Sequence, residues 1–129
     1  MTDSEQIGLI VFAHGSRVVP ANEGVERVAV AAAALGGFEL YSAAFLELAA
    51  PTLEEAVEKL AGEGARRIIV APYFLTMGMH LTRDLPEILR NIRAKHPGLE
   101  LESTPPLDGH PSLAGILAER ARRAASERP

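Results

Sequence analysis

The 129-residue sequence contains no cysteine. Without a thiol, the chain can form no disulfide, no thiolate metal site and no iron–sulfur cluster from its own side chains. This absence permits a reducing compartment, and we expect the protein to be cytoplasmic. Aromatic residues make up only 5% and charged residues 23%, beside 47% hydrophobic residues, which is typical of an ordinary globular protein rather than a disordered or fibrous one.

Long hydrophobic runs and an excess of positive charge are also missing. The start "MTDSEQ" is polar and precedes only a short apolar run, so we expect neither a signal peptide nor a membrane span. The formal net charge of −4 argues against nucleic acid as a partner, because phosphate binding needs a positive field. No internal repeat or low-complexity linker divides the chain, and we predict one domain over residues 1–129, with a core from about 7 to 124.

Short apolar runs alternate with amphipathic runs four times along the chain. This pattern predicts an α/β fold with three α/β/α layers around a four-stranded, mainly parallel sheet, covered on both faces through right-handed crossovers. Gly36 and Gly37 should end the first helix, and Thr52 and Glu55 have the spacing of a capping box. The expected strands are 7–13, 38–45, 66–75 and 99–104, and the helices are 20–35, 51–64, a third ending before Pro97, and a fourth from Pro111.

Titratable side chains follow the predicted strands. His14 comes directly after the first strand in "LIVFAHGSR", and Glu47 follows the second. His80 lies just ahead of the third helix, after Gly78, which permits a sharp turn. Because ligands of open parallel sheets gather beyond the carboxyl ends of the strands, we predict that two imidazoles and one carboxylate meet at one rim.

Each of these residues also has a purely structural interpretation. A histidine at such a junction can cap a helix or bond a backbone carbonyl, and a carboxylate near a helix N-terminus is favoured by the helix dipole. Two histidines on separate glycine-containing loops favour a functional pair. For His96, in the last turn of the third helix, and His110, just before the fourth, capping is the preferred interpretation.

Four segments together carry a resemblance to a known family: "AHGSR", "AFLELAAPTLEEAV", "IIVAPYFLTMGMHLTRDLP" and "PPLDGHPSL". In this order and spacing they resemble the short CbiX/SirB class of sirohydrochlorin chelatases, from Ile7 to about Arg120. The resemblance implies a chelatase-like fold and the insertion of a divalent metal, Co²⁺ in preference to Fe²⁺, into sirohydrochlorin without ATP or an organic cofactor, in cobalamin or sirohaem biosynthesis. It also implies metal binding by His14 and His80 and, because the family has a double-length form with two facing halves, a homodimer.

The residue types suit that chemistry. Two neutral imidazoles bind Fe, Co, Ni or Zn and leave coordination positions open for exchange. A displaced histidine, with an ordinary pKa of about 6.5, can accept a pyrrole proton, and Glu47 is a second candidate base. Arg17 and Arg83 are candidates for binding the carboxylates of sirohydrochlorin, although both could be ordinary surface arginines. The remaining predicted substrate contacts are Ser16 and the loop residues Met77, Gly78 and Met79.

Other functions stay open at this point. A metal or tetrapyrrole carrier would use the same histidines without turnover, and the sequence does not separate it from an enzyme. A phosphohydrolase with His14 as nucleophile is disfavoured, because Ala13 stands where such enzymes carry arginine. Ser16 lacks the G-x-S-x-G context of a serine hydrolase. Nothing in the residues distinguishes cobalt from iron.

Overall fold

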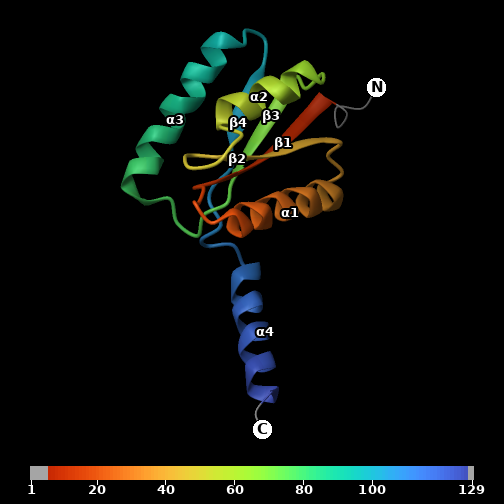
Figure 1. Cartoon of the computed structure of the whole chain (residues 1–129), viewed down its shortest axis with the longest axis vertical. Helices are drawn as coiled ribbons and strands as arrows, with labels where there is room; N and C mark the ends of the chain where they lie inside the picture. Colours follow the sequence, from red (N-terminus) through yellow and green to blue (C-terminus); the bar gives the residue numbers. More distant parts are fainter. Residues whose placement is uncertain (1–5, 128–129) are drawn as a thin grey trace.

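The computed structural model describes residues 6–127 and contains the four predicted pairs of strand and helix (Figure 1). The second, third and fourth strands are shorter than expected. The third strand ends at Pro72, because the residues after it leave the sheet toward the rim. In chain order the elements are β1 (Ile7–Ala13), α1 (Val19–Gly36), β2 (Leu40–Phe45), α2 (Leu53–Gly62), β3 (Arg67–Pro72), α3 (Gly78–Lys95), β4 (Glu100–Ser103) and α4 (Ser112–Ser126).

The four strands form a parallel sheet in the order β2-β1-β3-β4, which confirms the predicted α/β class. Phe12 of β1 pairs with Ala44 of β2 on one side and with Pro72 of β3 on the other. The three strands therefore end at nearly the same level. Their carboxyl ends form one rim, from which the loops after β1, β2 and β3 leave.

Alternation along β1 divides the core between the two faces of the sheet. Ile10 and Phe12 pack with the buried residues of α2 and α3, whereas Leu9 and Val11 pack with Ala29 and other residues of α1. Each large side chain that is fully removed from water contributes about 1.5–3 kcal/mol. Among the described residues, no polar or charged residue is buried. Hydrophobic packing on both faces therefore holds the three layers together.

Two helix ends have the capping residues that the sequence predicts. The Glu55 amide donates to Thr52 Oγ1 at 3.2 Å, and the Thr52 amide donates to Glu55 Oε1 at 2.8 Å, which confirms the capping box of α2. Gly37 ends α1 in the left-handed conformation, with φ of 75°. No helix within residues 6–127 is both long and apolar enough to cross a membrane.

The fourth helix departs from the prediction that helices cover the sheet on both faces. No residue of α4 is buried, and the helix points away from the sheet (Figure 1). The reason lies in the preceding linker, because the amides of Leu107 and Asp108 donate to the carbonyls of Phe74 and Leu75 at 3.1 and 2.9 Å. These bonds lead the chain across the rim instead of back over the strands.

Candidate functional site

The loops that follow β1 and β2 are joined through their backbones. The Leu46 amide donates to the carbonyl of Ala13 at 2.9 Å, and the Glu47 amide donates to that of His14 at 3.0 Å. Gly15 has a φ of 97°, and a Cβ on it would lie 1.8 Å from the Glu47 carbonyl oxygen. Only glycine fits between the two loops, so the His-Gly dipeptide sets how closely they approach.

This approach places the His14 imidazole against the Glu47 carboxylate. Nε2 of His14 lies 2.9 Å from Oε1 of Glu47, and the two side chains are 58% and 56% exposed. A neutral imidazole that donates from Nε2 keeps its lone pair on Nδ1. Because exposed ion pairs contribute at most about 1 kcal/mol, the contact serves to orient the imidazole rather than to stabilise the fold.

His80 lines the same cavity as His14. The histidine is the third residue of α3, so the prediction that it precedes the helix is wrong: with φ of 68°, Gly78 turns the chain and already begins the helix. The cavity has a volume of about 360 Å³. It is lined by His14, Leu46, Phe74, Thr76, Met77, His80, Leu81, Asp84 and Ile88.

Asp84 is a cavity residue that the sequence analysis missed. It lies one helical turn after His80, and the spacing of four residues places both side chains on one face of α3. That spacing was the available signal. With Asp84, the cavity holds two imidazoles and one carboxylate among its lining residues, and Glu47 bonds His14 at its edge.

The predicted substrate contacts divide between two neighbouring cavities. Met77 lines both the cavity of the histidines and a second one of about 860 Å³, whereas Gly78, Met79 and Arg83 line the second cavity only. Arg17 is exposed and lines neither. The remaining lining residues of the second cavity are Thr76, Thr82, Pro106 and Asp108.

Ser16 has structural partners. Its hydroxyl accepts a hydrogen bond from the Val18 amide at 3.0 Å. The Asn22 side chain accepts from the Ser16 amide at 3.0 Å and donates to the Ser16 carbonyl at 2.8 Å. Asn22 was missed in the sequence, where its signal is a single amide side chain in the first turn of α1. Together these bonds fix the loop that presents His14 and Arg17.

The donor atoms around the cavity form an open set. No cluster of three or more histidine, cysteine, aspartate or glutamate side chains within residues 6–127 could hold a metal ion as a complete site. The rim instead offers the bonded pair His14 and Glu47, with His80 on the same cavity. Few protein ligands leave coordination positions free, which suits an ion that must be passed on.

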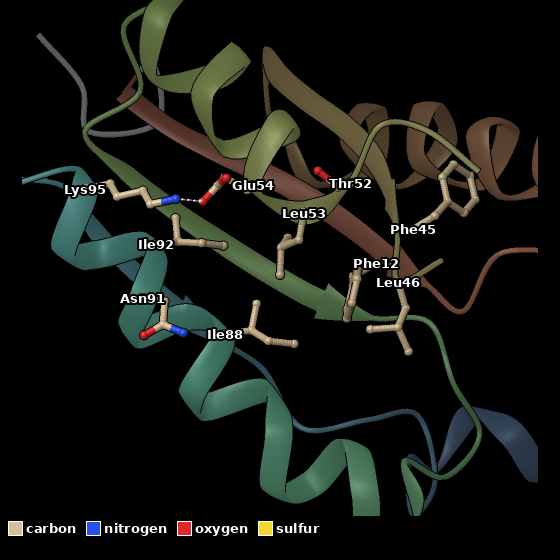
Figure 2. Close-up of a pocket in the computed structure, with 10 residues that line it drawn as sticks. All are labelled: Phe12, Phe45, Leu46, Thr52, Leu53, Glu54, Ile88, Asn91, Ile92 and Lys95. Carbon is tan, nitrogen blue, oxygen red and sulfur yellow. Dashed lines mark hydrogen bonds and ion pairs between the residues drawn. The ribbon is translucent and has the colours of Figure 1, made fainter. Parts of the chain in front are cut away.

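A further cavity lies between α2 and α3, against the ends of β1 and β2 (Figure 2). Its volume is about 340 Å³, and Leu46 and Ile88 line both this cavity and that of the histidines. At one end, Lys95 Nζ lies 2.7 Å from Glu54 Oε1, and this hydrogen bond raises the pKa of Lys95. Six of its ten lining residues are apolar and none is a histidine, so we place no metal ligand there.

The two remaining histidines lie at helix ends. His110 Nδ1 accepts a hydrogen bond from the Ser112 amide at 3.0 Å, which confirms the capping role before α4. His96 is the C-terminal cap of α3, where its backbone amide donates to the Arg93 carbonyl. Its side-chain Nε2 is buried without a partner among the described residues, so the imidazole does not bond the helix carbonyls through that atom.

Comparison with known proteins relates this architecture to one family. The family model CbiX matches residues 8–124. A sirohydrochlorin cobaltochelatase of Methanococcoides burtonii is 36% identical, over 92% of this chain and 96% of the relative. Another from Methanopyrus kandleri is 30% identical, over 94% of this chain and 99% of the relative.

Solved structures show the same fold. A putative cobalamin biosynthesis CbiX protein from Marinobacter aquaeolei superposes with a TM-score of 0.81 at 27% identity, covering 95% of this chain and 99% of that one. The sirohydrochlorin chelatase SirB of Bacillus subtilis, solved with cobalt, gives a TM-score of 0.84 at 24% identity, covering 92% of this chain and 50% of that one. The chain belongs to the CbiX family.

Proposed function

We propose that this chain is a sirohydrochlorin chelatase, which inserts a divalent metal ion into the macrocycle without ATP. The observation that carries the proposal is the cavity at the carboxyl ends of the strands, which is lined by both His14 and His80 and bordered by Glu47. Membership of the CbiX family and the names of the curated relatives support it.

The metal ion is a substrate, and its ligands in this proposal are His14 and His80. The spacing of His14 and Glu47 supports a carboxylate ligand beside them. Nε2 of His14 can bind the ion only in the tautomer that carries its proton on Nδ1, so metal binding replaces the hydrogen bond to Glu47. If the bonds from Nε2 and from Glu47 Oε1 to the ion are each about 2.1 Å long, these two atoms, 2.9 Å apart, subtend an angle of about 90° at the ion. That angle separates adjacent positions of an octahedron, and the positions left open can receive the nitrogens of the macrocycle.

Proton transfer accompanies the insertion. The macrocycle gives up two N–H protons while its nitrogens replace water and protein ligands on the metal, so two groups must accept protons. As the ion leaves, the imidazoles and the Glu47 carboxylate regain lone pairs, and they are within reach of the same ring. The groups that hold the ion thus become the bases that take the protons.

Substrate binding follows from the residues around the two rim cavities. Phe74 and Met77 line the cavity of the histidines, and Met79, which is largely exposed, extends an apolar surface suited to a flat ring. Arg83 lines the neighbouring cavity, and Arg17 lies exposed beside the His14 loop, so both can bind carboxylates of the substrate from the edge. Ser16 contributes by shaping that loop.

Two further points belong to the proposal. The resemblance to the short form of the family supports a homodimer. The lack of cysteine is compatible with work in the reducing cytoplasm.

A carrier that binds metal or tetrapyrrole without turnover remains the alternative function. The open donor set favours the enzyme, because a carrier needs enough ligands to retain its cargo, and no complete site exists within residues 6–127. The two functions differ in stoichiometry. A chelatase forms many equivalents of metallated product per chain, whereas a carrier stops at one.

The test is to mix the protein with sirohydrochlorin and Co²⁺ without oxygen and to follow the absorption of the macrocycle, then to repeat the assay with Fe²⁺. We expect His14→Ala and His80→Ala each to lower the rate by about a hundredfold or more, the scale of losing an essential acid–base group. His96→Ala removes an imidazole from the far end of α3 and is the matched control. Unchanged rates in both rim variants, or no acceleration by the wild-type protein, would refute the proposal.

A further inference from the structure

Asp84 has no structural partner that accounts for a carboxylate at its position in α3. Its side chain makes no hydrogen bond or ion pair with any of residues 6–127. It lies in the second turn of the helix, beyond the first turn, where the helix dipole favours negative charge. The residues three and four positions away, at 80, 81, 87 and 88, include no lysine or arginine. Neither ion pairing nor the helix dipole therefore explains this carboxylate.

The cavity of the histidines is the place where Asp84 can act. His80, Asp84 and Ile88 follow one another at intervals of four residues, and all three line that cavity. They run beside the buried face of the helix, to which Leu81 and Leu85 belong. Among the described residues that line the cavity, Asp84 is the one carboxylate. One edge of α3 thus carries an imidazole and a carboxylate, one turn apart, along the same cavity.

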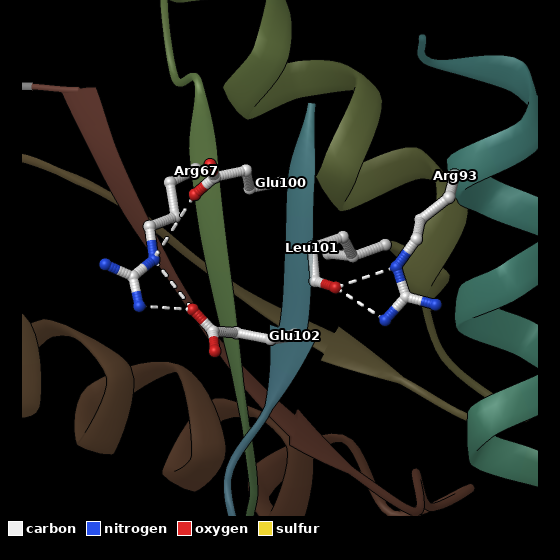
Figure 3. A network of polar contacts seen from close by, with 5 residues as sticks. All are labelled: Arg67, Arg93, Glu100, Leu101 and Glu102. Carbon is white, nitrogen blue, oxygen red and sulfur yellow. Dashed lines mark hydrogen bonds and ion pairs between the residues drawn. The ribbon is translucent and has the colours of Figure 1, made fainter. Parts of the chain in front are cut away.

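Contacts at the far end of α3 fix how the helix is turned about its axis. Arg93 Nε and Nη2 both donate to the Leu101 carbonyl of β4, at 2.9 and 2.6 Å (Figure 3). Lys95 Nζ donates to Glu54 Oε1 of α2 at 2.7 Å (Figure 2). Because these bonds tie the helix to two different elements, the edge that holds residues 80, 84 and 88 stays at the cavity.

His80 lacks the kind of partner that His14 has. Glu47 Oε1 lies 2.9 Å from Nε2 of His14, whereas the His80 imidazole makes no hydrogen bond or ion pair with any of residues 6–127. A histidine that binds a metal ion through one ring nitrogen donates, as a rule, its other ring N–H to a carboxylate, a carbonyl or water. Asp84 is the carboxylate nearest to His80 along the lining of the cavity.

We propose that Asp84 is a positioning residue for His80, an inference that rests on the proposed function. When the ion binds Nε2 of His80, the Asp84 carboxylate accepts a hydrogen bond from Nδ1–H of the same ring. Helical side chains lean toward the N-terminus of their helix, so Asp84 leans toward His80, and Cβ atoms four residues apart are separated by about 5–6 Å. Rotation about side-chain torsions closes this bond without any movement of the backbone.

The bond prepares the imidazole for the ion without touching the ion. It keeps the proton on Nδ1, so that the lone pair of Nε2 is free to bind the metal, and the carboxylate makes the imidazole a more basic ligand. Asp84 thereby differs in role from Glu47, which we propose as a ligand or base. The two carboxylates act on opposite sides of the ion, one on each histidine loop.

Co²⁺ affinity in the absence of the macrocycle tests the inference, measured by competition with a chelating dye. Asp84→Ala should weaken Co²⁺ binding about 10- to 100-fold, the usual effect of removing such a partner. Asp84→Asn should restore most of the affinity, because its amide oxygen can still accept from Nδ1–H. Glu87→Ala is the matched control, since it removes an equal charge from the same helix at a residue that lines neither rim cavity. It should bind Co²⁺ like the wild type.

A double-mutant cycle determines whether Asp84 acts through His80. In a chain that already carries His80→Ala, the further change Asp84→Ala should cause no additional loss of affinity. A full additional loss would show that Asp84 binds or attracts the ion by itself, and would overturn the positioning role. Equal losses in Asp84→Ala and Asp84→Asn would overturn it too, because charge and not hydrogen bonding would then matter.

Failure of this inference is distinguishable from failure of the proposed function. If Asp84→Ala binds Co²⁺ like the wild type while His80→Ala does not, the role of Asp84 is refuted and the proposed ligand His80 stands. If His80→Ala also binds like the wild type, or if the wild type binds no Co²⁺, the proposed metal ligands are refuted and the role of Asp84 with them.

A spectroscopic signature separates positioning from a merely structural role. Zn²⁺ is diamagnetic and also binds imidazole, so the tautomer of His80 in the loaded chain can be read from long-range ¹H–¹⁵N correlations. We expect the proton on Nδ1 in the wild type and in Glu87→Ala, and a mixture of metal-bound forms in Asp84→Ala. The same spectrum for the wild type and Asp84→Ala would contradict the proposal.

Discussion

Replacing Gly15 by alanine should separate the two loops that build the rim. A residue with a side chain costs about 1–2 kcal/mol in the left-handed conformation that Gly15 adopts. The new Cβ would also lie 1.8 Å from the Glu47 carbonyl oxygen, a distance that no side chain can accept, so the loops must move apart. That movement stretches the hydrogen bonds Leu46 to Ala13 and Glu47 to His14, each worth about 1 kcal/mol.

The total loss is therefore about 3–4 kcal/mol, against a typical domain stability of 5–15 kcal/mol. Urea denaturation followed by circular dichroism measures it. Gly64→Ala is the control, because Gly64 has a similar φ of 109° but nothing lies within 4 Å of the added Cβ. It should lose only the conformational term of about 1–2 kcal/mol.

Activity gives the second read-out of the same variant. Since the joined loops hold the His14 and Glu47 side chains 2.9 Å apart, Gly15→Ala should also lower the chelatase rate strongly, whereas Gly64→Ala should not. Equal stabilities and equal rates for the two variants would refute the reasoning that backbone contact between the loops sets the geometry of the rim.

Three more predictions concern the core, a helix cap and the rim. Leu60→Ala, at a fully buried position of α2, should cost about 2–5 kcal/mol by urea denaturation, and no loss would contradict the packing described. Thr52→Ala removes the cap of α2 and should cost about 0.5–2 kcal/mol, with Thr82→Ala as an exposed control. Glu47→Gln keeps the size of the side chain but not its charge, so metal insertion should slow while the urea midpoint stays unchanged; a wild-type rate would exclude Glu47 as ligand or base.

Much of the fold was predictable because local and global signals agree. Ile68 and Val70 lie in a continuous apolar run, and such runs separated by amphipathic helices allow few arrangements other than a parallel sheet. The spacing of Thr52 and Glu55 indicated the capping box of α2, although the predicted range 51–64 begins two residues before the helix, which starts at Leu53. The start of α3 was misplaced, because Gly78 is a turn residue by its φ and a helical residue by its hydrogen bonds.

The sequence predicted which residues meet at the rim, but not which cavity Arg83 lines or which residue holds the loop. His14 and Glu47 follow strands that pair with each other, so their meeting followed from topology. The separation of Arg83 from the cavity of the histidines could not be predicted, because it depends on which face of the first two turns of α3 each side chain occupies. Asn22 holds the loop from a helix that the motif does not include, and such tertiary contacts leave little trace in spacing.

The placement of α4 lay beyond the sequence pattern for another reason. Periodicity predicts a helix there, and the helix forms, but periodicity does not say in which direction the helix runs. The direction of the helix is decided by backbone bonds of the linker to Phe74 and Leu75, which involve no distinctive residue type.

The absence of buried polar or charged residues among residues 6–127 has a consequence for solution studies. Folding takes no ionisable side chain of that part fully out of water, so no charge has to be carried into the core. Acid or base should then unfold the protein only well away from neutrality. A rate that changes between pH 6 and pH 8, followed alongside circular dichroism, would consequently report titration of the reacting groups themselves.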